Sequence, residues 1–227
     1  MNTLARNFDY IATPWVNLDL ETGVHFYSPH VYHQMFQQMD DKPVLNIFKS
    51  HHHYDFVADF IEYLTGQFHV FYIYRDPRDV MVSFWRILQT YDWDRGPKAP
   101  TVGEFMRSEP MGDILRYQKR QMSSVLHRWT SHVQGWRGCE NTLGAEKIFL
   151  INYGDLDRQF DTTVKNIGKR IGSTVVSSIR PDKTDNVISP GPGGRTHSSV
   201  FTPADYDYVM QVAGETMEQL GIPWEAD

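Results

Sequence analysis

The sequence predicts an α/β fold in which a doubly wound, mostly parallel sheet is flanked by helices. Short apolar runs with strand composition alternate along the chain with longer segments of helical periodicity. Two helix starts carry a capping residue followed by proline, at Asp76-Pro77 and at Thr202-Pro203. This alternation of strands with clearly started helices is typical of parallel sheets.

Length and composition indicate a globular protein. The chain has 227 residues, of which 41% are hydrophobic and 22% charged, so it can bury a sizeable core. We expect a single domain over residues 1–227. Within it we expect an irregular segment at 1–42, a sheet and helix core at 43–181, and a loop with the last helix at 182–227.

Charge and cysteine content exclude several classes of protein. The net charge of −6 disfavours nucleic acid and anionic lipid as partners. No apolar run has the length of a membrane span, and the first residues lack the apolar core of a signal peptide. The single cysteine, Cys139, excludes an internal disulfide and fits a reducing compartment. We therefore expect a cytoplasmic location. The sequence leaves the oligomeric state open.

The elements can be assigned in chain order. Three apolar runs predict strands, at Pro43–Phe48, Phe68–Tyr74 and Lys147–Asn152. Helices are predicted from Asp55 to Gly66, from Pro77, along a stripe from Ile114 to Trp136, around Val164–Ile171 with closure by Gly172, and from Thr202 to Gly221. Two polar stretches, Tyr91–Pro110 and Asp182–Val200, predict loops.

The segment FHVFYIYRDPRDVMVSFW at residues 68–85 combines a buried strand, an arginine and a helix start. Arg75 follows the strand, and Asp76-Pro77 has the pattern of an N-cap with proline at the first helical position. Helix N-terminal amides favour an anion and arginine adds a charged fork, so the segment predicts a phosphate-binding turn. An ordinary surface ion pair on a strand–helix turn is the alternative.

Polar side chains follow each of the three predicted strands. Lys49 and His51 follow the first, Arg75 follows the second, and Tyr153 follows the third. In open α/β sheets the ligand crevice lies at the carboxyl ends of the strands. The sequence therefore predicts that these residues gather at one binding site.

Several of these segments resemble a known family. Arg75-Asp76-Pro77-Arg78-Asp79-Val80, with Ser83 eight residues beyond Arg75, resembles the 3′-phosphate motif of sulfotransferases that use 3′-phosphoadenosine 5′-phosphosulfate (PAPS). Further segments are similar to that family in the same order. They are Phe48–His51 (its catalytic histidine), Trp129–Trp136 (the helix before its third strand), Ile151–Leu156 (near the adenine) and Phe201-Thr202 (the start of its last helix). The match covers roughly residues 43 to 222 in pieces.

The resemblance implies a catalytic pair. His51 would be the general base that takes a proton from an acceptor hydroxyl or amine, work that suits an imidazole. Lys49 would neutralise charge that builds on oxygen during sulfuryl transfer. His52 could take the place of His51, and a metal site built from His51 and His53 is a competing interpretation. We expect no metal, because lysine and arginine supply the positive charge.

The resemblance also implies a cofactor site. Arg75 and Ser83 would hold the 3′-phosphate, and Tyr153 would contact the adenine. Arg195, in the glycine-rich tract that matches the family's C-terminal cofactor loop, is a further phosphate contact. The fold would be the three-layer, P-loop NTPase-type sandwich of sulfotransferases. PAPS would be the donor and adenosine 3′,5′-bisphosphate (PAP) the product. The acceptor would be a small molecule, a sugar or a peptide.

One part of the family pattern is not found. Sulfotransferases carry an N-terminal strand and a proline-lysine-serine-glycine-threonine-threonine-tryptophan type of loop that cradles the 5′-phosphosulfate, and the sequence contains no such loop. We expect a truncated chain that lacks this loop and its strand. An unfamiliar substitute in residues 1–40, or a family member that binds PAP or PAPS without catalysis, are the alternatives. A phosphotransferase is disfavoured because no GxxxxGK[ST] motif is present.

Overall fold

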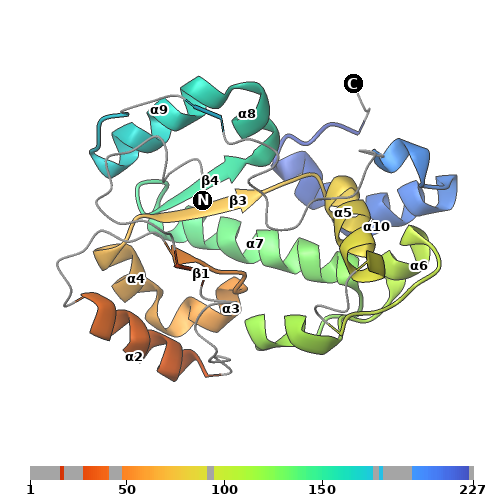
Figure 1. Ribbon diagram of the computed structural model, residues 1–227, viewed down its shortest axis with the longest axis horizontal. Coiled ribbons are helices and arrows are strands. Elements are labelled where there is room, and N and C mark those ends of the chain that lie inside the picture. The colour runs from red at the N-terminus through yellow and green to blue at the C-terminus, as the bar shows by residue number, and fades with distance from the viewer. Residues whose placement is uncertain are drawn as a thin grey trace. The chain divides into compact units, whose positions relative to one another are not determined.

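The computed structural model describes residues 16–17, 28–40, 48–90, 95–175, 179–180 and 196–224. It is a helix-rich α/β structure with a small parallel sheet (Figure 1), which confirms the predicted fold class. The chain divides into two compact units. One contains Met1–Ile73 and Cys139–Ser189, and the other contains Tyr74–Gly138 and Pro190–Asp227. The single domain over residues 1–227, with its three segments, stays a prediction.

The strands in the described part of the chain form two hydrogen-bonded pairs. β1 (Val16–Asn17) runs parallel to β2 (Phe48–Lys49), with Val16 opposite Phe48. β3 (Val70–Tyr74) pairs with β4 (Ile148–Asn152), and both arrows point the same way in Figure 1. These two strands lie within the predicted segments. Of the strand predicted at 43–48, residues 43–47 lie outside the described part of the chain.

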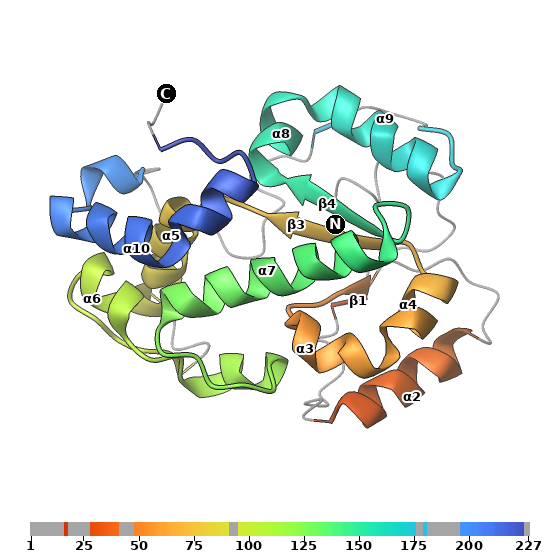
Figure 2. The same ribbon diagram turned by 180° about the vertical axis from the view of Figure 1, so that it is seen from behind.

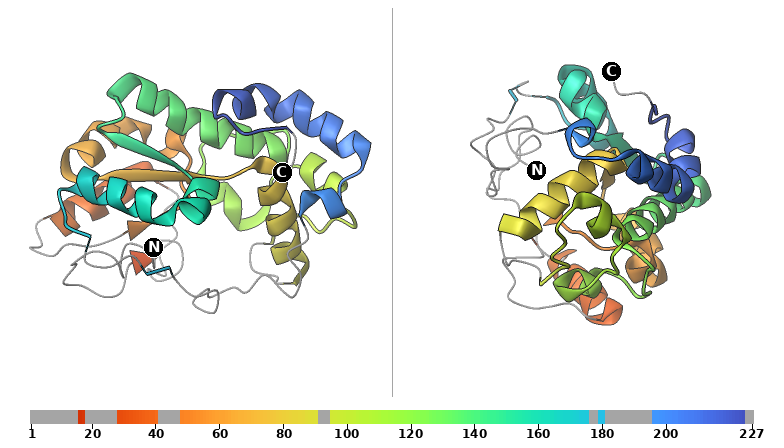
Figure 3. Two further views of the ribbon diagram at one scale, coloured as in Figure 1. Left: turned by 90° about the horizontal axis from the view of Figure 1, so that it is seen from above. Right: turned by 90° about the vertical axis from the view of Figure 1, so that its right-hand side faces the viewer.

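The β3–β4 pair is covered on one side by two consecutive helices, α8 (Tyr153–Arg158) and α9 (Phe160–Ile171), as Figure 3 shows from above. Apolar side chains at helical spacing on α9 meet β4 in a buried core. It consists of Ile151, Phe160, Val164 and Ile167, flanked by Phe71, Phe149, Leu156, Ile171 and Val175. Gly172 ends α9 in the left-handed conformation at φ 64°, which favours glycine and confirms the predicted closure.

An aromatic cluster holds α2 (Pro29–Asp40) against three short helical pieces. Its rings pack edge to face and come from α2, from β2, from the helical pieces and from the residue after them: Tyr32, Phe36, Phe48, Phe56, Phe60 and Phe68. The pieces are α3 (Tyr54–Val57), a 3₁₀ turn η1 (Ala58–Phe60) and α4 (Ile61–Gln67).

The single helix predicted from Asp55 to Gly66 is therefore wrong in detail. Phe60 leaves helical geometry at φ −135° and ψ 21°, which breaks the regular hydrogen-bond ladder between η1 and α4. The N-cap is His53, whose Nδ1 accepts from the Asp55 amide at 3.3 Å. Gly66 lies within α4, which ends at Gln67.

The second unit is built from helices. They are α5 (Pro77–Thr90), α6 (Val102–Arg107), the 3₁₀ helix η2 (Gly112–Tyr117), the 125–138 part of α7 (Val125–Leu143), η4 (His197–Ser199) and α10 (Pro203–Gln219). α10 lies beside this part of α7 (Figure 2), where Gln134 Nε2 donates to Thr216 Oγ1 at 2.8 Å. Phe84 of α5 meets Phe105 of α6 edge to face at 5.4 Å.

Two expectations for this unit are corrected. The stretch predicted as loop, Tyr91–Pro110, contains α6, whose Thr101 cap accepts from the Glu104 amide. The long helix predicted along the stripe from Ile114 to Trp136 begins only at Val125. Gln118 adopts an extended backbone after η2, so the apolar residues before it belong to a separate turn.

The start and end of the last helix are confirmed. Thr202 and Asp205 form a reciprocal capping box with proline at the first turn. Gly221, which follows the C-cap Leu220, has φ 66°.

The α9–β4 core should dominate the stability of its unit. Ile167 is 3% exposed, so Ile167→Ala is expected to lower the free energy of unfolding by about 2–5 kcal/mol through a cavity and lost burial. Urea unfolding followed by circular dichroism measures the loss. Ile171→Ala, at the partly buried rim of the same helix, should cost clearly less. Equal losses for the two variants would contradict this account of the core.

Candidate functional site

The end of β2 brings Lys49 and His51 together. Lys49 Nζ lies 2.7 Å from His51 Nε2, across one intervening residue of extended chain. An ammonium can only donate, so Lys49 Nζ is the donor and His51 Nε2 the acceptor of this contact. His51 is exposed. The predicted proximity of these two side chains is confirmed, and their catalytic roles stay predictions.

The neighbouring histidines lie in different surroundings. His52 is 6% exposed, and its ring lies 4.3 Å from that of Tyr32 and 4.4 Å from that of Phe56. Its Nδ1 is also hydrogen-bonded to Ser50 Oγ. His53 is 4% exposed and caps α3 through contacts with Asp55. Only His51 of the three combines exposure with a cationic neighbour, so it fits the proposed base best.

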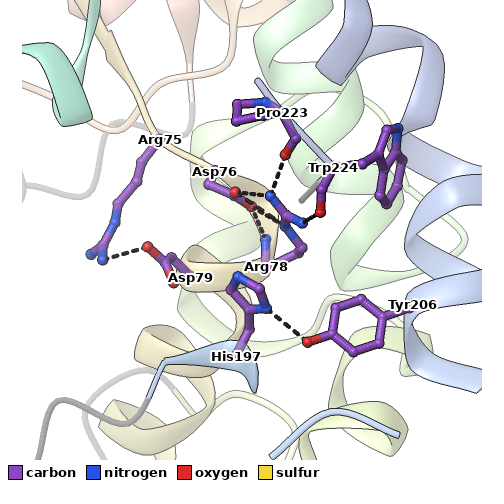
Figure 4. Close-up of polar contacts among 8 residues, drawn as sticks. All are labelled: Arg75, Asp76, Arg78, Asp79, His197, Tyr206, Pro223 and Trp224. Atoms are coloured by element: carbon purple, nitrogen blue, oxygen red, sulfur yellow. Dashed lines mark hydrogen bonds and ion pairs between the residues drawn. The ribbon is translucent and has the colours of Figure 1, made fainter. Parts of the chain in front are cut away.

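Arg75 lies between the end of β3 and the start of α5, at the predicted turn. Its side chain is 42% exposed, and Nη2 pairs with Asp79 Oδ2 at 2.8 Å, one helical turn along (Figure 4). The Asp79 carboxylate occupies Nη2 of the guanidinium and leaves the side chain partly exposed. The surface ion pair considered as the alternative is thus present, and it leaves the arginine accessible to an anion.

Asp76 and Arg78 form a tighter pair beside this turn. Asp76 Oδ1 accepts from the Arg78 backbone amide at 2.8 Å, which caps α5, and Oδ2 accepts from Arg78 Nη2 at 2.6 Å. Arg78 also donates to the carbonyl oxygens of Pro223 at 2.6 Å and Trp224 at 2.5 Å (Figure 4). Its side chain is 2% exposed, so nearly all of its donors are satisfied inside the protein.

His197 lies close to this arrangement. Its Nδ1 is 3.0 Å from the Tyr206 hydroxyl of α10 (Figure 4). Burial and the positive charge of Arg78 lower the pKa of the His197 imidazole, against a raising effect of the Asp76 and Asp79 carboxylates. The lowered pKa favours the neutral form of this imidazole beside the Asp76–Arg78 pair.

The other predicted cofactor residues have separate positions. Ser83 lies on α5 and is half-buried. Tyr153 directly follows β4 as the first residue of α8 and is 45% exposed. Arg195 and the glycine-rich tract before it lie outside the described residues. The contacts assigned to all three stay predictions.

Sequence reasoning missed Arg78 and His197. The Arg75–Val80 motif contains Arg78, but its carbonyl partners are 145 and 146 residues away and carry no side-chain signal. His197 lies within the stretch predicted as loop, Asp182–Val200, which has no periodic pattern. The signal that could have indicated Arg78 is its charge, opposite to that of Asp76 two residues away, next to a predicted helix start.

Two further properties concern the described part of the chain. No group of three histidine, cysteine, aspartate or glutamate side chains there is arranged to hold a metal ion. None of its helices has the length and apolar character that crossing a membrane requires.

The lowered pKa of His197 predicts a dependence of stability on pH. The unfolded chain protonates this imidazole near its ordinary value of 6.5, while the folded chain takes the proton at lower pH. The stability that comes from this neutral imidazole is fully present above pH 6.5 and is lost as the pH falls below that value. His197→Asn should flatten this part of the curve in unfolding experiments from pH 8 to 5. An unchanged slope in this variant would contradict the assignment.

Comparison with solved structures identifies a protein of similar fold. The crystal structure of mouse sulfotransferase SULT7A1 complexed with PAP matches with a TM-score of 0.52 and 16% identity. The match covers 82% of this chain and 70% of that one, and it shows a shared fold. No curated protein matches the sequence.

A family model provides the assignment. The model described as the sulfotransferase domain matches residues 5–187, most of the chain, including β1–β4 and the Arg75 turn. This match also covers residues upstream of residue 43, where the segments that resemble sulfotransferases begin. The chain belongs to the sulfotransferase domain family.

Proposed function

We propose that this chain transfers a sulfuryl group from PAPS to a hydroxyl or amine of an acceptor that is a small molecule, a sugar or a peptide. The observation that carries the proposal is the Lys49–His51 pair at the end of β2, in a chain of the sulfotransferase family. The Arg75 turn supports it with an accessible guanidinium at a helix N-terminus. A cytoplasmic location is part of this proposal.

The roles of the pair follow from its chemistry. His51 Nε2 takes the proton of the acceptor group as the acceptor oxygen or nitrogen bonds to sulfur. The bond between sulfur and the 5′-phosphate oxygen breaks, and PAP leaves with the bonding electrons. Lys49 then donates to the oxygens on which negative charge builds, a contact exchanged for its present one with His51. The proton ends on His51, which releases it to water.

The cofactor contacts are assigned to residues that carry suitable donors. Arg75 and Ser83 hold the 3′-phosphate, Tyr153 contacts the adenine, and Arg195 adds a phosphate contact. The mouse protein complexed with PAP shares the fold, which supports the choice of nucleotide. A module that binds PAP or PAPS without catalysis is the second candidate, because the sequence contains no recognisable loop for the 5′-phosphosulfate.

Nucleotide binding tests the Arg75 assignment. Arg75→Ala removes a charged fork from the 3′-phosphate, so the Kd for PAP should rise by about ten- to a hundredfold in calorimetry. The matched control is Arg137→Ala on α7, where the arginine donates to Gln219. It should bind PAP like the wild type. Equal affinity of the Arg75→Ala and wild-type proteins would remove the assignment.

Turnover separates the enzyme from the binding module. With labelled PAPS and a panel of phenols, amines and sugars, His51→Ala should lower kcat by about 10²–10⁴ while the Kd for PAP changes little. His30→Ala on α2 is the control, since that side chain is exposed. Full activity in His51→Ala would place the base elsewhere. Tight PAP binding without turnover of any acceptor would favour the module.

A further inference from the structure

We propose that Arg78 is a positioning residue that sets the affinity of the Arg75 turn for a 3′-phosphate, by neutralising Asp76 and tying the turn to the C-terminal segment. The inference rests on the proposed function. Asp76, Arg78 and the carbonyls of Pro223 and Trp224 are here called the clamp (Figure 4). The clamp joins the start of α5 to the residues that follow α10.

The first step concerns charge on the turn. Arg75 and Asp79 form one opposite-charge pair, and Arg78 and Asp76 form the other. Asp76 directly precedes the helix and follows Arg75, the residue proposed to hold the phosphate. Without a cationic partner its carboxylate would repel that anion. Arg78 cancels this charge through contacts of Nε and Nη2 with both carboxylate oxygens, at 2.6–3.1 Å.

The second step concerns geometry. A guanidinium that is 2% exposed has little freedom, because it donates to Asp76 and to two carbonyls at the same time. The Trp224 ring lies 5.7 Å from Arg78 Cζ and adds a cation–π contact. The turn is therefore held by the residues that follow α10.

The third step predicts opposite changes in PAP affinity for substitutions of Asp76 and of Arg78. Asp76→Asn keeps the oxygen that caps the Arg78 amide but removes the negative charge, which leaves Arg78 to attract the phosphate. Arg78→Gln leaves the carboxylate of Asp76 uncancelled beside the phosphate. Damage to folding can weaken binding in either variant, but it cannot strengthen it.

Calorimetry with PAP and with adenosine 5′-monophosphate, which lacks the 3′-phosphate, tests the clamp. Asp76→Asn should bind PAP about three- to tenfold more tightly than the wild type, and the gain should shrink in high salt. Arg78→Gln should bind PAP about tenfold more weakly. The double variant should bind PAP more tightly than Arg78→Gln, because it lacks the uncancelled carboxylate, and all four proteins should bind the monophosphate alike.

Three results would overturn the proposal. They are weaker PAP binding in Asp76→Asn, unchanged PAP binding in Arg78→Gln, and a loss in Arg78→Gln that the monophosphate shares. A further result distinguishes failure of this proposal from failure of the proposed function. If the wild type fails to prefer PAP over the monophosphate, the turn holds no 3′-phosphate, and the proposed cofactor site fails together with the clamp.

Discussion

The buried guanidinium of Arg78 constrains the packing of the second unit. Arg78 is almost fully enclosed, and a charge in that position is tolerated only with an acid and enough acceptors around it. Asp76 and the carbonyls of Pro223 and Trp224 meet that need. The start of α5, the end of the chain after α10 and the turn that carries Arg75 are thereby fixed relative to one another.

The first unit separates three consecutive histidines by their surroundings. His52 is held among aromatic rings, and His53 is used as a helix cap. His51 remains at the surface in contact with an ammonium group. Of the three, His51 is thus the histidine that fits the proposed general base, while His52 and His53 are buried in the fold. Lys49 contacts His51 Nε2 in the structure, and in the proposed reaction it would also meet the negative charge that builds on oxygen.

The sequence allowed prediction of elements whose signals are local. β3 and β4 follow from apolar composition, and α9 and α10 follow from periodicity combined with Gly172 and with the Thr202 capping box. The predicted long helix was wrong at its start because an apolar stripe continues across Gln118, where the backbone becomes extended. The clamp at Arg78 could not be predicted, because backbone carbonyls at the far end of the chain leave no trace in the residue pattern. The family motifs identified the candidate residues, but contacts of Ser83, Tyr153 and Arg195 with a nucleotide depend on a ligand.

A crystal structure of the chain with PAP tests the central claim most directly. The account predicts that the 3′-phosphate lies within hydrogen-bond distance of the Arg75 guanidinium and the Ser83 hydroxyl. It also predicts that the freed 5′-phosphate faces Lys49 Nζ, with His51 Nε2 open to an acceptor. A nucleotide bound away from the Arg75 turn, or a 5′-phosphate remote from Lys49 and His51, would contradict it.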